Sequence, residues 1–223
     1  MRRTNFILLL FIVLTIIGCK KNDPVNFHRE YFGLNEGRYV IYDVVDIIHD
    51  ADLNQHDTSY YQLKTVWRDT IIDNEGRVAQ EFHRFTRLTP SDPWVIADVW
   101  TGIIDGIRAE LVEENQRKVK LVFAPTLSKQ WDANAYNMLG ELDCYYRNIH
   151  QDTTINGIAL DSTLIVEQDE FTSLIDTVRM YEVYKKHVGL VYKHYKDNHY
   201  QFGSSEVVEG TESYYQFVSS GYE

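Results

Sequence analysis

Residues 38–48 read Arg-Tyr-Val-Ile-Tyr-Asp-Val-Val-Asp-Ile-Ile, a run rich in β-branched and aromatic residues. Apolar side chains that recur with a period of two, rather than 3.6, are typical of a half-buried β-strand. We expect one face of this strand to carry Tyr39, Ile41, Val45 and Ile47. The segment predicts a fold built from strands.

The same pattern recurs to the end of the chain, separated by turn-forming residues such as Asn156-Gly157. No segment carries a long apolar stripe at helical spacing. We therefore predict a mainly β, single domain of about ten to twelve antiparallel strands, a meander curled into a barrel or half-barrel with few helices. Further strands are expected at residues 59–69, 78–88, 94–101, 107–113, 119–123, 144–151, 163–168, 178–186, 189–196 and 214–219.

Several of these segments also predict which side chains share a face. Residues 94–101 align Trp94, Ile96 and Trp100. Lys118 and Lys120 alternate with apolar residues, which predicts a half-buried edge strand whose lysines face away from the core.

Residues 125–141 form the main irregular stretch of the sequence. The large side chains of this stretch are expected to hold a loop over one end of the core: Trp131, Tyr136 and Met138.

The N-terminus resembles a secretory signal. Arg2 and Arg3 precede an apolar run over residues 6–17. Twelve residues span about 18 Å as a helix, well short of the roughly 30 Å core of a bilayer. A signal peptide is therefore favoured over a transmembrane anchor.

Residues 15–19 read Thr-Ile-Ile-Gly-Cys and resemble the lipobox of bacterial lipoproteins, with Ile16 where leucine is common. The resemblance implies cleavage before Cys19 and lipidation of its thiol by acyl chains such as palmitate, which hold the protein to a membrane. An ordinary secretory signal with a chance cysteine is the alternative. We predict a signal peptide over 1–18, a lipidated tether over 19–30 and a mostly-β domain over 31–223.

The chain has a formal net charge of −11, and loss of residues 1–18 would remove two arginines and no acids, leaving −13. Nucleic acid is not expected as a partner, because its phosphates demand basic side chains. A polybasic membrane contact is excluded on the same ground, so the acyl chains would be the membrane anchor. Lys20, directly after the acceptor cysteine, lacks the aspartate associated with inner-membrane retention and favours the outer membrane. The leaflet and the periplasmic or surface side stay open.

Three segments together resemble a loose group of lipoproteins from Bacteroidetes-type bacteria. They are residues 31–42 (YFGLNEGRYVIY), residues 120–123 with Trp131 shortly after, and residues 182–192 (EVYKKHVGLVY). Gly33 stands where the group usually has proline, and Lys186-His187 where it has Lys-Gly. The resemblance implies a lipidated, mostly-β envelope domain and carries no activity.

No cofactor, metal or catalytic site is expected from motifs. His194 and His199 flank Asp197, but an odd spacing on a strand points two side chains to opposite faces. No Gly-x-Ser-x-Gly elbow is present. Cys144 is expected to be a buried small hydrophobe rather than a nucleophile.

Tyrosine is the most unusual feature of the composition, with sixteen residues. A candidate binding face for an envelope protein, a glycan or an apolar ligand consists of Tyr181, Tyr184, Tyr192 and Tyr195. The alternative is ordinary β-propensity and core filling.

These observations favour a lipid-anchored envelope lipoprotein with a non-enzymatic binding or scaffold domain. A carrier of a lipid or other hydrophobic ligand in a β cavity is the alternative, with a hydrolase third. An apolar cavity of about 300 Å³ or more would favour the carrier.

Overall fold

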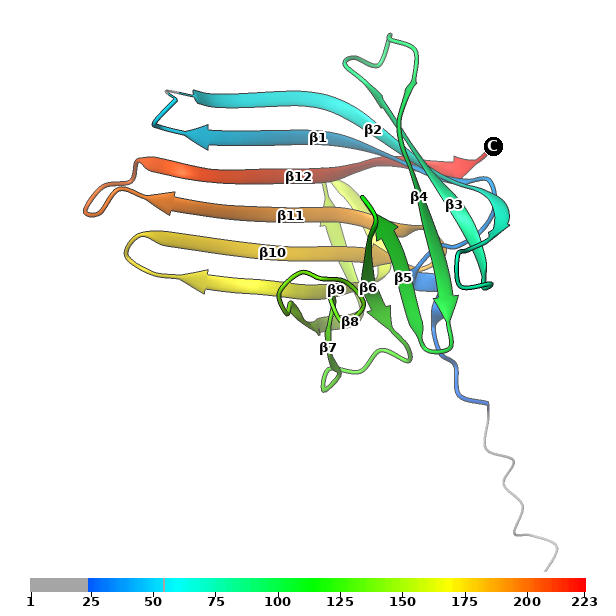
Figure 1. Cartoon of the computed structure of the whole chain (residues 1–223). Coiled ribbons are helices and arrows are strands. Elements are labelled where there is room, and N and C mark those ends of the chain that lie inside the picture. The colour runs from blue at the N-terminus through cyan, green and yellow to red at the C-terminus, as the bar shows by residue number, and fades with distance from the viewer. Residues whose placement is uncertain (1–23, 54) are drawn as a thin grey trace, which may run out of the picture.

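The computed structural model describes residues 24–53 and 55–223, and within them it consists of antiparallel strands and a single 3₁₀ turn, η2 (Arg29–Tyr31) (Figure 1). The predicted mainly β fold is confirmed. The strands are β1 (Arg38–Asp50), β2 (Gln55–Ile72), β3 (Val78–Arg87), β4 (Val95–Asp105), β5 (Arg108–Glu113), β6 (Gln116–Val122), β7 (Gln130–Asp132), β8 (Asp143–Ile155), β9 (Ile158–Thr172), β10 (Asp176–Lys185), β11 (Gly189–Tyr200) and β12 (Val207–Tyr222).

All twelve strands belong to one sheet in the order β6-β5-β4-β3-β2-β1-β12-β11-β10-β9-β8-β7. The first strand pairs with the last, from Arg38 opposite Tyr222 to Asp50 opposite Glu209. The meander is therefore continuous, and β6 and β7 are its two edges. In Figure 1, β2, β1, β12, β11, β10 and β9 lie side by side, while β3 to β6 run steeply across one end of them.

The two edges approach each other and nearly close the barrel. The Tyr146 hydroxyl accepts a hydrogen bond from Val122 N and donates one to Val122 O, both at 2.9 Å. Val119 N donates to Ala133 O at 2.9 Å, and Trp131 Nε1 donates to Val119 O at 3.0 Å. These contacts occupy backbone groups that an edge strand would otherwise leave unpaired.

Val40, Tyr42 and Val44 form the face of β1 that packs into the core. Tyr39, Ile41, Val45 and Ile47 alternate with them and lie on the opposite, less buried face. The signal was present in the sequence. Asp43 shares the parity of Tyr39 and lies exposed beside Gln62, with which it makes a hydrogen bond of 2.8 Å. A carboxylate on one face indicates that this face meets water.

Register shifts turn the side chains of Ile96 and Lys120 to the side opposite the one that strict alternation predicts. Ile96 is 52% exposed whereas Trp100 lines the interior, because the β3–β4 register shifts between Arg84 and Phe85. Lys120 is also interior, with a side chain only 12% exposed. Leu121 lies opposite Ala109 and Val119 opposite Glu110, which leaves Lys120 as the extra residue of a bulge. A bulge re-aims a side chain that strict alternation would place outside.

The irregular stretch holds β7 and is only partly pinned. Trp131 packs on Tyr146 with ring centroids 4.9 Å apart, as expected. Met138 is 95% exposed, so its predicted packing was wrong, and Tyr136 is exposed beneath the Arg108 guanidinium at 4.8 Å.

The η2 turn packs against the β10–β11 turn, which brings together two of the segments quoted for the lipoprotein resemblance. His187 N donates to Glu30 O at 2.8 Å. Gly33 has φ +68°, and a Cβ at this position would lie 2.5 Å from Val188 O. Glycine is required here by conformation and by space.

Candidate functional site

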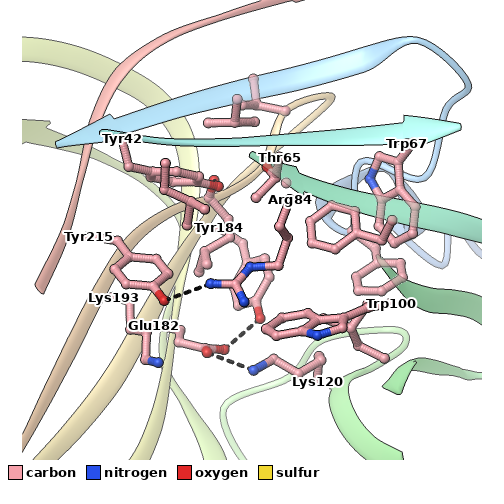
Figure 2. Close-up of a pocket in the computed structure, with 18 of the residues that line it drawn as sticks. Tyr42, Thr65, Trp67, Arg84, Trp100, Lys120, Glu182, Tyr184, Lys193 and Tyr215 are labelled. Carbon is pink, nitrogen blue, oxygen red and sulfur yellow. Dashed lines mark hydrogen bonds and ion pairs between the residues drawn. The ribbon is translucent and has the colours of Figure 1, made fainter. Parts of the chain in front are cut away.

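A pocket of about 80 Å³ lies inside the barrel, where β1 to β6 face β10 to β12 (Figure 2). The side chains that line it are aromatic, aliphatic, cationic and carboxylate. This mixture is unlike the apolar filling of the rest of the core, whose main cluster is built from residues such as Leu121, Phe123 and Leu164.

One wall of the pocket is a chain of aromatic rings. Phe32 and Trp67 have centroids 5.4 Å apart, Trp67 and Phe82 4.3 Å, and Phe82 and Trp100 6.4 Å. Gly102 on β4 makes room for Trp67, because a Cβ there would lie 2.3 Å from the indole ring. This row of rings lies on the right of Figure 2, from Trp67 above to Trp100 below.

The floor is an ion network centred on Lys120. Lys120 Nζ lies 2.7 Å from Glu182 Oε1 and 3.4 Å from Glu113 Oε1. Lys118 Nζ lies 3.4 Å from the other oxygen of Glu113, and the Tyr184 hydroxyl donates to Glu182 Oε2 at 2.6 Å. Both carboxylates of the pocket are thus engaged by protein groups.

The charges in this network stabilise one another. Burial by itself raises the pKa of Glu113, but the charges of Lys120, Lys118 and Lys193 outweigh it and lower that pKa to about 2. Burial likewise lowers the pKa of Lys120, but Glu113 and Glu182 outweigh it and raise the pKa above its usual range. Burial, followed by the charge of Glu182, raises the pKa of Tyr184 well above its ordinary value. The network is therefore charged at neutral pH, with Tyr184 as a neutral donor.

Two further cations, Arg84 and Lys193, line the pocket. The Arg84 guanidinium lies over Trp100 at 4.0 Å; its Nη1 lies 2.8 Å from Asp98 Oδ2, and its Nη2 donates to the Tyr215 hydroxyl at 3.3 Å. Lys193 Nζ lies 4.9 Å from the centroid of the Tyr215 ring. The ion pairs of the described residues include none from Lys193.

The pocket has a charge opposite to that of the chain. Four cationic side chains (Arg38, Arg84, Lys120 and Lys193) and two carboxylates line it, a formal charge of +2. The whole chain carries −11. A positive, partly apolar pocket in an acidic protein is suited to an anion.

The structure separates the four tyrosines of the predicted binding face. Tyr184 lines the pocket. Tyr181 and Tyr192 have centroids 5.6 Å apart and lie on the opposite face, because each precedes a pocket residue on its strand. Tyr195 lies 5.8 Å from Lys193 Nζ. No face common to all four exists, and a role for any of them in binding stays a prediction.

Tyr181 belongs to a row across the outer face. Its ring stacks on His194 at 4.9 Å and 15°, and His194 meets Tyr214 edge-on at 4.9 Å. The guanidinium groups of Arg179 and Arg147 lie 4.7 and 5.3 Å from the Tyr181 ring. These contacts explain the position of His194 without a metal.

The remaining candidates from the sequence have structural surroundings. His199 Nδ1 lies 2.8 Å from Asp176 Oδ1. The part of the chain that the structure describes contains no group of three or more His, Cys, Asp or Glu side chains that could hold a metal ion. Cys144 is buried, as expected, and burial raises the pKa of its thiol to about 12. Cys19 lies outside the described residues.

The comparisons with known proteins give no family. No protein-family model, curated protein or solved structure matches the chain. Within residues 24–53 and 55–223, no helix has the length and apolar character needed to cross a bilayer.

The pocket was not predicted from the sequence. Lys120 stands in an apolar strand and Glu182 stands between Tyr181 and Val183, so a charge among core-forming neighbours was the available signal. Nothing in the sequence placed these two residues within 2.7 Å of each other.

Proposed function

We propose that this chain is a lipid-anchored protein of the cell envelope whose β-barrel binds a small ligand in the pocket between the aromatic wall and Lys193. The observation that carries the binding function is that Lys193, for which the described residues show no ion pair, lines a pocket together with a row of aromatic rings. Binding sites commonly combine an apolar lining with a few convergent polar groups.

Binding is favoured over the carrier of a hydrophobic ligand. The cavity of about 80 Å³ is much smaller than the threshold of about 300 Å³ set for a carrier. Its lining also carries an excess of cations over carboxylates, and an acyl chain would remove water from these charges without supplying a partner for them.

A pocket-filling variant tests the binding function. We expect Val40→Phe to abolish ligand-induced thermal shifts in a panel of small organic acids, amines, amides and sugars, because Val40 lines the pocket. Val44→Phe is the matched control. Val44 is buried on the same face of the same strand as Val40 but does not line the pocket. Circular dichroism checks that both variants fold. Ligands that shift both variants equally, or no ligand at all, would count against the pocket.

The anchor has its own test. Cys19→Ala should abolish incorporation of labelled palmitate and sedimentation with membranes, because two or three acyl chains are what make such anchoring stable. Uptake of label by the variant would refute lipidation at Cys19. This result bears on location alone and leaves the pocket test unaffected.

A further inference from the structure

We infer that the ligand of the pocket is a short monocarboxylate, with its carboxylate between Arg84 and Lys193 and its apolar tail against the aromatic wall. The inference rests on the proposed binding function and specifies the chemical class of the ligand. Figure 2 shows the Arg84 guanidinium to the right of Tyr215 and above Trp100, and Lys193 below Tyr215, with the Glu182 carboxylate between Lys193 and Trp100.

The charge of the ligand follows from the pairing inside the pocket. Glu182 is engaged by Lys120 and Tyr184, and Glu113 by Lys118 and Lys120. Lys193 lies opposite Glu182 on β11 and its charge helps to lower the pKa of Glu113, but the ion pairs of the described residues include none that joins it to either carboxylate. The four cations of the lining outnumber its two carboxylates, and an anionic ligand would offset that excess.

The number of donors argues for one negative charge. Arg84 Nη1 is engaged by Asp98, which leaves Nη2, near the Tyr215 hydroxyl, and the Lys193 ammonium to face a ligand. A carboxylate has two oxygens and can be satisfied by these groups. A phosphate dianion brings more oxygens and a second charge than these donors match.

The size of the pocket and its wall argue for a short apolar tail. An engineered cavity that takes up benzene measures about 150 Å³. The pocket here measures about 80 Å³, which suits an acid of about two to four carbon atoms rather than an aromatic acid. Trp67, Phe82 and Trp100 provide the surface on which the alkyl group would lose its contact with water.

The probe is propionate, titrated at constant ionic strength into the full-length protein in detergent micelles. Binding is measured by isothermal calorimetry and by tryptophan fluorescence, since Trp67 and Trp100 line the pocket. We expect propionate to bind about tenfold or more tightly than propionamide, its neutral isostere, because a hydrogen bond to a charged group is worth about that factor. Inorganic phosphate should bind more weakly than propionate, and benzoate should bind weakly because it exceeds the cavity.

Lys193→Met should weaken propionate binding by about tenfold or more and leave propionamide unchanged. Lys185→Met is the matched control, because Lys185 pairs with Asp161 outside the pocket. It should bind propionate as the native protein does.

Each contrary outcome has a separate meaning. Equal binding of propionate and propionamide, tighter binding of phosphate, or no effect of Lys193→Met would overturn the monocarboxylate while the pocket could still bind another class. No propionate binding, with thermal shifts from other compounds that Val40→Phe abolishes, would also overturn only the monocarboxylate. No compound sensitive to Val40→Phe would overturn both this inference and the binding function.

Discussion

Glu110 and Glu182 are both almost completely buried, at 1% and 3% exposure, but their surroundings differ. Glu110 lies among three arginines: Arg77 at 3.2 Å, Arg108 at 3.0 Å and Arg117 at 3.8 Å. Arg117 also reaches Glu75 at 2.6 Å, so the cations have further acids beside them. This cluster is closed, with every charge matched by neighbours.

Glu182 belongs to a network that opens on a cavity. Its own oxygens are engaged by Lys120 and Tyr184, but Lys193, directly opposite on β11, has no ion pair within the described parts of the chain. The comparison separates two uses of buried charge. The Glu110 cluster connects strands and turns through ion pairs. In the pocket, Lys193 is the cation that the proposed ligand would bind.

The largest expected effect comes from breaking the closed cluster. Glu110→Ala should lower the free energy of unfolding by about 3–4 kcal/mol, near the lower end of the range for a broken buried pair, because the three arginines are partly solvated. Urea unfolding followed by tryptophan fluorescence measures it. Glu141→Ala, at an exposed glutamate, is the control and should change stability by less than about 0.5 kcal/mol. A similar loss in both variants would remove the distinction drawn for Glu110.

The decline of the unfolding free energy at acid pH should depend on the ion network of the pocket. The folded-state pKa of Glu113 is about 2, below its ordinary value of 4.5, so its stabilisation is complete above about pH 4.5 and is lost as the pH falls through 2. On the order of 2–3 kcal/mol depends on this carboxylate. Glu113→Gln should flatten the decline in unfolding free energy between pH 4.5 and 2. Glu141→Gln should leave that slope unchanged, and an unaltered slope in Glu113→Gln would contradict the assignment.

The fold was readable from the sequence because its evidence is local. Alternation marked the strands, and Asn156-Gly157 marked the β8–β9 turn, where both residues have positive φ. The pairing of β1 with β12 joins residues far apart in the chain, and neither segment alone specifies it. The sequence also indicated which face of β1 meets solvent, because Asp43 lies on that face.

The pocket was not readable, for two physical reasons. Its lining runs from Phe32 to Tyr215 and converges only when the barrel curls. The bulge that turns Lys120 inward depends on the register with β5, and strict alternation predicts the opposite side. A charged residue at a bulge is therefore a poor guide to solvent exposure, and Lys120 is the case that shows it.

The smallest expected effect on stability is that of Lys193→Met, and it contrasts most clearly with Glu110→Ala. Lys193→Met should leave the free energy of unfolding unchanged or raise it by up to about 1 kcal/mol, because a cation without an ion pair is replaced by an apolar side chain of similar length. Lys118 and Lys120 still compensate Glu113 in this variant. A substitution that keeps stability and removes propionate binding would identify Lys193 as a ligand-binding residue. If Lys193→Met instead unfolded the protein as readily as Glu110→Ala, Lys193 would be a structural cation, and the two regions would use buried charge in the same way.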